Sequence, residues 1–177
     1  AEPNIPQPFR TNKEMWKNDR MNLFIRTMGK RIGPKAETEE GRKKLLVVDG
    51  EPYWFSADMA LYFNYYILQA YDCSSYADLD NRFSQLVLQF SSKQTEEEIA
   101  KKLIVTENFE AHSGTGGVTF TTRDGQSVPS YLGMATWQPL NGRKGGIGSY
   151  HMEKDYAANP VYKYLRKGIQ LMNPAVK

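Results

Sequence analysis

Residues 56–70, SADMALYFNYYILQA, weigh most on the fold class because they are apolar around nearly the whole circumference of a helix. Ser56 stands where the N-cap of such a helix is expected. A helix without a polar face is buried, either in the core of its own domain or in an oligomer interface. Four aromatic side chains within five positions favour the oligomer interface: Tyr62, Phe63, Tyr65 and Tyr66.

The segments around this stretch are predicted to be mainly helical. Helical spacing of apolar residues marks three of them: 12–32, 76–90 and 156–172. Thr95 and Glu98 form a capping-box pattern that starts another helix. Two apolar runs in residues 43–55 flank Asp49-Gly50, a pair that type I′ turns favour, and predict a β-hairpin.

The composition changes after residue 106, where Gly, Ser and Thr become frequent. The alternation in GVTFTT predicts a strand that ends in a turn at residues 123–125. YLGMATWQPL is predicted to be a strand or an irregular segment, and NGRKGGIGS a flexible basic loop. Residues 1–11 contain three prolines and are predicted to form an extended arm. The resulting prediction is an α+β fold: a mostly helical single domain over 12–177, with a small β-hairpin and a Gly-rich β or irregular C-terminal third.

The totals describe a globular chain of one domain's length. Of 177 residues, 40% are hydrophobic and 24% are charged, and no run of about 18 apolar residues predicts a membrane span. The single cysteine excludes an intramolecular disulfide. This favours a cytoplasmic or virion location. The start AEP, without Met, keeps open a cleaved exported or organellar protein.

Charge is segregated along the chain, although the net charge is only +3. Residues 1–50 carry a net +4, residues 51–100 a net −6 and residues 101–177 a net +5. The basic ends are expected to meet an acidic protein surface, including that of a second copy, or single-stranded nucleic acid. The residues expected to make these contacts are Arg26, Lys30, Arg31, Arg143, Lys144, Arg166 and Lys167.

The lone cysteine supplies an alternative, enzymatic hypothesis. Asp-Cys-Ser-Ser at residues 72–75 opens a predicted helix, and a helix N-terminus lowers a thiol pKa. The motif resembles the Asp-Cys-Ser-Gly of NlpC/P60 cysteine peptidases, in which a later histidine serves the thiol. The resemblance implies a hydrolase with Cys73 as nucleophile and His112 as base, with His151 as the other candidate. The alternative, non-catalytic interpretation of Cys73 is a buried structural residue.

A second resemblance covers residues 47–63. DGEP, WF and ADMA are similar to the hairpin and helix that open the N-terminal domains of BRO-type phage antirepressors. This resemblance points, like the basic segments, towards nucleic acid.

Other chemistry is not marked in the sequence. NGRKGGIG lacks the Lys-Ser/Thr of a phosphate-binding loop, and His, Cys and carboxylates show no metal-ligand spacing. Neither a cofactor nor a metal is therefore predicted. The leading prediction is a non-enzymatic structural or adaptor subunit of an assembly, with a viral or phage nucleoprotein or coat-like protein as one form of it. The alternatives are the Cys73 hydrolase and an exported or organellar accessory subunit.

Overall fold

The computed structural model describes residues 20–174, which divide into two compact units. Within the described residues, unit 1 holds 20–68, 84–103 and 141–143, and unit 2 holds 69–83, 104–140 and 144–174. The predicted arm, residues 1–11, lies outside the described residues.

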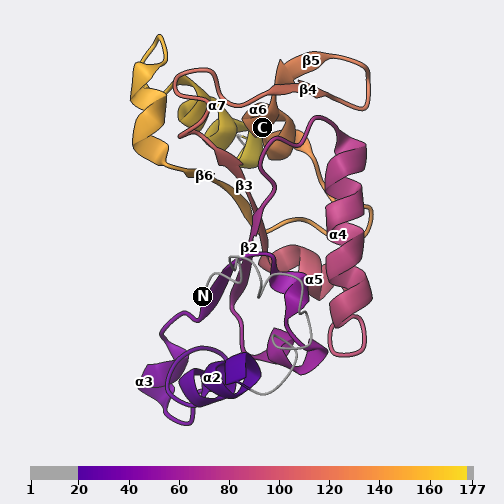
Figure 1. Cartoon of the computed structure of the whole chain (residues 1–177), viewed down its shortest axis with the longest axis vertical. Helices are drawn as coiled ribbons and strands as arrows, with labels where there is room; N and C mark the ends of the chain where they lie inside the picture. Colours follow the sequence, from indigo (N-terminus) through magenta and orange to yellow (C-terminus); the bar gives the residue numbers. More distant parts are fainter. Residues whose placement is uncertain (1–19, 175–177) are drawn as a thin grey trace. The chain divides into compact units, whose positions relative to one another are not determined.

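Helices and strands are interspersed along the described chain (Figure 1). The α-helices are α2 (Arg20–Gly29), α3 (Glu39–Arg42), α4 (Tyr76–Phe90), α5 (Glu96–Lys102), α6 (Ser130–Thr136) and α7 (Lys163–Met172). The strands are β1 (Val47–Gly50), β2 (Tyr65–Gln69), β3 (Leu103–Asn108), β4 (Thr119–Thr121), β5 (Ser127–Pro129) and β6 (Gly146–Tyr150). The short 3-10 helices within residues 20–174 are η2 (Pro52–Trp54), η3 (Ala57–Leu61) and η4 (Met152–Ala157). None of the helices described between Arg20 and Met172 has the length and apolar character needed to cross a bilayer.

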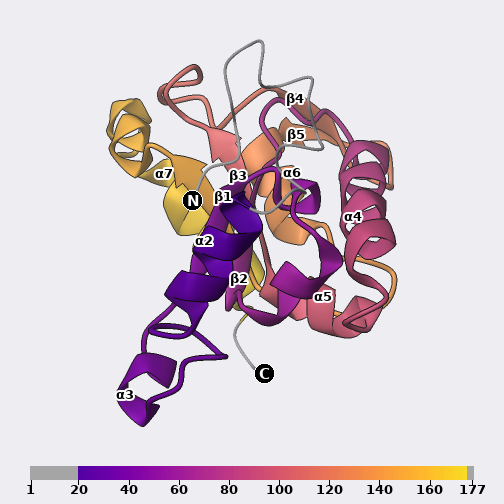
Figure 2. The same cartoon turned by 60° about the horizontal axis from the view of Figure 1, so that its bottom comes forward.

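In unit 1, β1 and β2 run parallel (Figure 2), with Val47 opposite Tyr65 and Val48 opposite Tyr66. Asn64, just before β2, fixes this pairing. Its side-chain oxygen accepts the backbone N–H of Leu46 at 2.8 Å, and its own N–H donates to the Leu46 carbonyl at 2.8 Å. Asn64 therefore marks the point where the chain enters the strand.

The core of unit 1 is a row of aromatic rings. Phe63 packs edge-on against Phe55 and Tyr66, and Tyr66 stacks on Phe90 with ring centroids 5.2 Å apart. All four rings are fully buried. The Tyr66 hydroxyl donates to the Ala60 carbonyl or to the Gln94 side chain, so its polar end is satisfied inside the core.

In unit 2, β3 and β6 run parallel, with Ile104 opposite Gly146 and Asn108 opposite Tyr150. Helix α6 contacts both β6 and α7, and it also contacts the antiparallel pair β4–β5. Gly133 of α6 allows the close approach to β4, because a Cβ there would lie 2.2 Å from the ring of Phe120. The carboxyl ends of β3 and β6 therefore share one edge.

The prediction of a mostly helical α+β fold is wrong, because the described chain is an α/β arrangement with parallel strands. The helix expected over residues 56–70 is a 3-10 turn, η3, followed by strand β2. The expected hairpin at Asp49-Gly50 is absent, since β1 pairs parallel with β2. Residues 130–136 are a helix, and the expected basic loop contains strand β6.

Several predicted elements are confirmed. Helix α4 spans Tyr76–Phe90 as expected, and β4 ends in the turn at residues 123–125. Helix α5 has the complete capping box, with Thr95 and Glu98 each bonding the other's backbone N–H. The predicted helices over 12–32 and 156–172 shorten, within the described residues, to α2 and α7.

Candidate functional site

Polar side chains gather in unit 2 around the carboxyl end of β3. Glu107 and Asn108 end the strand, His112 lies in the loop that follows, and Asp72 comes three residues after β2. Ser130 begins α6. Residues at the carboxyl ends of parallel strands are those that α/β proteins use most often for chemistry.

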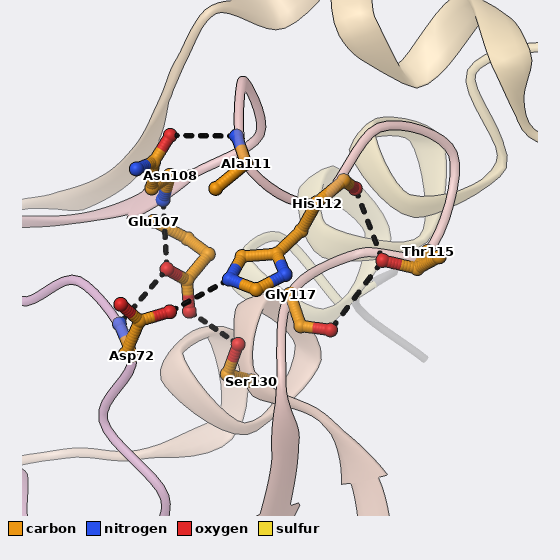
Figure 3. A network of polar contacts seen from close by, with 8 residues as sticks. All are labelled: Asp72, Glu107, Asn108, Ala111, His112, Thr115, Gly117 and Ser130. Atoms are coloured by element: carbon orange, nitrogen blue, oxygen red, sulfur yellow. Dashed lines mark hydrogen bonds and ion pairs between the residues drawn. The ribbon is translucent and has the colours of Figure 1, made fainter.

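The carboxylate of Glu107 is the centre of this cluster (Figure 3). Its Oε1 accepts the backbone N–H of Asp72 at 3.1 Å and that of Asn108 at 2.7 Å. Its Oε2 accepts the hydroxyl of Ser130. The side chain is fully buried, so three protein donors take the place of water around the charge.

Asp72 differs from Glu107 because its carboxylate reaches solvent. Its side chain is 59% exposed, and its Oδ1 lies 2.6 Å from Nε2 of His112, which is 23% exposed. The Asp72 backbone has φ +58°, in the left-handed region that non-glycine residues seldom adopt. The result is a carboxylate–imidazole pair at the surface, set on a strained backbone.

Hydrogen bonds between Thr115 and His112 close the loop that follows the imidazole. Both the hydroxyl and the N–H of Thr115 donate to the His112 carbonyl, at 3.0 Å and 3.1 Å. Gly117 then passes against the buried carboxylate with φ +105°. A Cβ at Gly117 would lie 1.9 Å from the Ser130 hydroxyl and 3.0 Å from Glu107, so only glycine fits without a shift.

One ligand atom from each of Asp72, Glu107 and His112 falls within 4.8 Å of the other two, which is close enough for a shared metal ion. The donor set argues for a hydrogen-bond network instead. Both oxygens of Glu107 already accept protein donors, and Nε2 of His112 already faces Asp72. A cation would have to compete with these bonds, so we assign no metal here.

The end of β6 adds an aromatic surface to the same edge. Tyr150 is 47% exposed, and its ring centroid lies 3.6 Å from that of His151. Nε2 of His151 lies 3.8 Å from a carboxylate oxygen of Glu110. Backbone bonding joins the two segments, since the N–H of Glu110 donates to the Tyr150 carbonyl at 2.9 Å.

The structure places Cys73 in the core of unit 2, only 3% exposed. Burial raises the pKa of its thiol, and the nearby charge of Arg82 opposes this only in part. A raised pKa disfavours the thiolate that a nucleophile needs. The imidazole of His112 pairs with Asp72, the residue before Cys73, and His151 faces Glu110.

The predicted basic residues are spread over both units. Arg26 pairs with Asp58, whose carboxyl pKa is lowered chiefly by a hydrogen bond from Lys93. Lys144 is 3% exposed and donates its ammonium to the carbonyls of Ala135 and Trp137, so it is not presented to a partner. The remaining five are exposed: Lys30, Arg31, Arg143, Arg166 and Lys167.

The four aromatic residues expected at an oligomer interface have different positions in unit 1. Phe63 and Tyr66 are fully buried in the core. Tyr62 is half-buried and covers Gly29 of α2, while Tyr65 is 37% exposed. Phe63 and Tyr66 are therefore accounted for by the folding of unit 1 itself.

Sequence reasoning missed Asp72, Glu107 and Ser130 as site residues. A usable signal was present for two of them. Glu107 follows the apolar run LIVT, and Asp72 follows YYILQAY, so both are carboxylates just beyond a strand-like segment. Had YYILQ been recognised as a strand, both would have been expected at the carboxyl edge of a parallel sheet.

Comparison with known proteins identifies the family to which the chain belongs. The family model of glycoside hydrolase family 18, BT1044-like, matches residues 6–171. The chain therefore belongs to this glycoside hydrolase family. Among curated protein sequences, none matches significantly.

Solved structures agree with the family match. A selenomethionine form of BT1044 with a Glu-to-Gln substitution has a TM-score of 0.71 and 32% identity, over 87% of this chain and 44% of that one. An endo-β-N-acetylglucosaminidase from Cordyceps militaris, solved as a double variant with fucosyl-N-acetylglucosamine-Asn, has a TM-score of 0.59 and 25% identity, over 85% of this chain and 49% of that one. The apo form of the same enzyme shares the fold at 22% identity. The chain thus spans less than half the length of these structures.

These matches correct the functional predictions. The fold resembles the barrel-like α/β fold of family 18, and the interpretation as a structural, adaptor or accessory subunit is wrong. The viral and nucleic-acid-binding interpretations are wrong for the same reason, as is the NlpC/P60-like hydrolase. The basic segments and the Asp-Cys-Ser-Ser motif are local patterns, whereas the site is assembled from strand ends that are distant in the sequence.

Proposed function

We propose that the protein is a glycosidase that acts on glycans containing N-acetylglucosamine, and that the carboxyl edge of β3 and β6 contributes to its sugar site. The observation that carries the proposal is the family match across residues 6–171. The substrate class is supported by the Cordyceps militaris endo-β-N-acetylglucosaminidase, which was solved with fucosyl-N-acetylglucosamine-Asn.

The geometry of unit 2 supports a sugar-binding role for this edge. Asp72 offers an exposed carboxylate whose direction is fixed by His112. Tyr150 offers an exposed ring face, on which the apolar face of a sugar ring packs. A pocket of about 270 Å³ borders the same loop and is lined by Thr115, Gly117, Val118, Thr119, Ser127, Val128 and Pro129. Hydroxyl groups and small apolar surfaces together suit a polyol ligand.

The two carboxylates of the site have different roles in this proposal. Glycoside hydrolysis passes through a positively charged, oxocarbenium-like transition state, and family 18 enzymes are assisted by the substrate itself. Asp72 can accept a hydrogen bond from a substrate amide or hydroxyl and stabilise the developing positive charge. Glu107 is fully buried and both of its oxygens accept protein donors, so it does not touch the substrate.

The test is a hydrolysis assay of the purified protein on Asn-linked glycopeptides, followed by mass spectrometry. Cleavage should leave a peptide that retains one N-acetylglucosamine. Asp72→Asn should lower kcat/KM at least roughly 100-fold, which is typical of a lost transition-state contact. Asp124→Asn is the matched control, because Asp124 is an exposed turn residue bonded to Thr122 and Gln126. Glycan binding without any product would contradict hydrolysis and leave a carbohydrate-binding protein.

A further inference from the structure

The buried carboxylate of Glu107 joins three separate segments of unit 2. Its donors are the N–H of Asp72 after β2, the N–H of Asn108 at the end of β3 and the hydroxyl of Ser130 at the start of α6. Figure 3 shows these bonds converging on one side chain. A carboxylate accepts up to about four hydrogen bonds, so three donors use most of its capacity.

Asp72 needs such a support because of its backbone. Its φ of +58° is unfavourable for a residue with a Cβ and persists only where the surroundings hold it. The bond from its N–H to Glu107 acts on the backbone, at 3.1 Å. The bond that its carboxylate accepts from Nε2 of His112 acts on the side chain, at 2.6 Å. Asp72 is therefore restrained at both ends.

We propose that Glu107 is a positioning residue, whose buried side chain holds the left-handed backbone of Asp72 and so aims the Asp72 carboxylate at His112 and the substrate. This inference rests on the proposed function, in which Asp72 touches the sugar. It goes further by assigning a role to a carboxylate that never reaches the substrate. Ser130 completes the support by donating to Oε2 of Glu107, and Gly117 leaves room for this bond, since a Cβ there would lie 3.0 Å from the Glu107 side chain.

The role depends on hydrogen bonding at a fixed place and not on a negative charge in the reaction. Glutamine can take over the same bonds. Its amide oxygen would accept the N–H groups of Asp72 and Asn108, and the Ser130 hydroxyl would rotate to accept from the new amide nitrogen. Leucine has a similar size but offers no acceptor, so the Asp72 N–H would lose its protein partner.

The experiment compares Glu107→Gln with Glu107→Leu by two readouts. The first is amide hydrogen exchange of Asp72, measured by NMR without substrate. Exchange should stay near the wild-type rate in the Gln variant and accelerate at least roughly tenfold in the Leu variant, as for a lost bond. The Gly125 amide, which donates to Thr122 in the β4–β5 turn, should not change in either.

The second readout is hydrolysis kinetics. Glu107→Gln should keep kcat within about threefold of the wild type, whereas Glu107→Leu should lower kcat roughly 100-fold, with a smaller change in KM, since small misplacements cost about that much. If Glu107→Leu does not fold, Glu107→Met replaces it. Methionine has a side chain of similar length with only a weak sulfur acceptor, so it should accelerate Asp72 exchange where Glu107→Gln does not.

Two results would overturn the inference. One is an unchanged Asp72 exchange rate in the Leu variant or, where that variant does not fold, in the Met variant, which would show that Glu107 does not restrain this backbone. The other is a Gln variant as impaired as the Leu variant, which would show that the charge is what matters. If the wild type hydrolyses no glycan, the proposed function fails, while the exchange measurements still decide whether Glu107 positions Asp72.

Discussion

Gly117 is the residue at which the site tolerates a side chain least. An alanine there would combine an unfavourable φ of +105° with a Cβ 1.9 Å from the Ser130 hydroxyl. Gly117→Ala should therefore lower the free energy of unfolding by about 2–5 kcal/mol, the sum of backbone strain and overpacking. Urea unfolding of the purified variant measures this change.

Gly125 supplies the control for that measurement. It also has a positive φ, +81°, but a Cβ there would meet nothing within 4 Å. Gly125→Ala should cost only the strain, about 1–2 kcal/mol. Equal losses at the two positions would show that the close approach of Gly117 to Glu107 and Ser130 contributes nothing.

Cys73 should react slowly with thiol reagents in the folded protein. Burial raises the pKa of its thiol, so little thiolate is present, and burial also keeps the reagent away from the sulfur. Because the chain has one cysteine, the reaction with a chromogenic disulfide reports this residue alone. Labelling should be fast in denaturant. Fast labelling of the native protein at neutral pH would contradict the burial.

At the scale of one element, β2 explains why the fold class was wrong. Its sequence YYILQ is apolar throughout, and a short apolar run cannot be assigned to strand or helix by its period alone. Helix α4 and the capped helix α5 were predictable, because their apolar spacing and capping box are local signals. Pairing partners are not local, so the parallel pairing of β1 with β2 and of β3 with β6 could not be predicted.

The alternation of β2 leads to a matched pair of variants. Tyr66 points into the core and Tyr65 points out. Tyr66→Ala should lower the free energy of unfolding by about 3–5 kcal/mol, as for other buried aromatic rings. Tyr65→Ala should cost less than about 1 kcal/mol. Equal losses in the free energy of unfolding for the two variants would contradict the alternation of a strand. They would indicate a segment that is buried on all sides.

At the scale of the whole molecule, the sequence predicted a globular chain but not its class. Charge segregation predicts contacts of the basic ends with an acidic protein surface or with nucleic acid, whereas Arg26 pairs with Asp58 of the same unit and Lys144 is buried. The Asp-Cys-Ser-Ser resemblance implies His112 as the partner of Cys73, but the structure pairs His112 with Asp72. Asp72, Glu107 and Ser130 come together only after folding, so no single stretch of sequence contains their arrangement.

Buried ionisable groups predict the pH dependence of stability. Burial raises the pKa of Tyr131 to about 12, and it also raises the pKa values of Tyr66 and Cys73. In the unfolded chain, cysteine loses its proton near pH 8.5 and tyrosine near pH 10. The stabilisation is therefore complete below about pH 8.5 and is lost as the pH rises towards the folded values.

Urea unfolding between pH 7 and 11 should show the free energy of unfolding falling with increasing pH. Tyr66→Phe and Tyr131→Phe should each reduce the slope above about pH 9.5, because phenylalanine has no proton to lose. A free energy that stays constant or rises over this range would contradict the buried state of these groups.

The buried ammonium of Lys144 has a consequence for chemical footprinting. It binds the carbonyls of Ala135 and Trp137 at the end of α6, so it is occupied as well as inaccessible. Amine acylation of the native protein should modify the exposed Lys167 readily and spare Lys144, and trypsin should cut after Lys144 only once unit 2 opens. Lys144 lies in a glycine-rich segment whose sequence predicts a flexible loop, yet its accessibility reports whether unit 2 is folded.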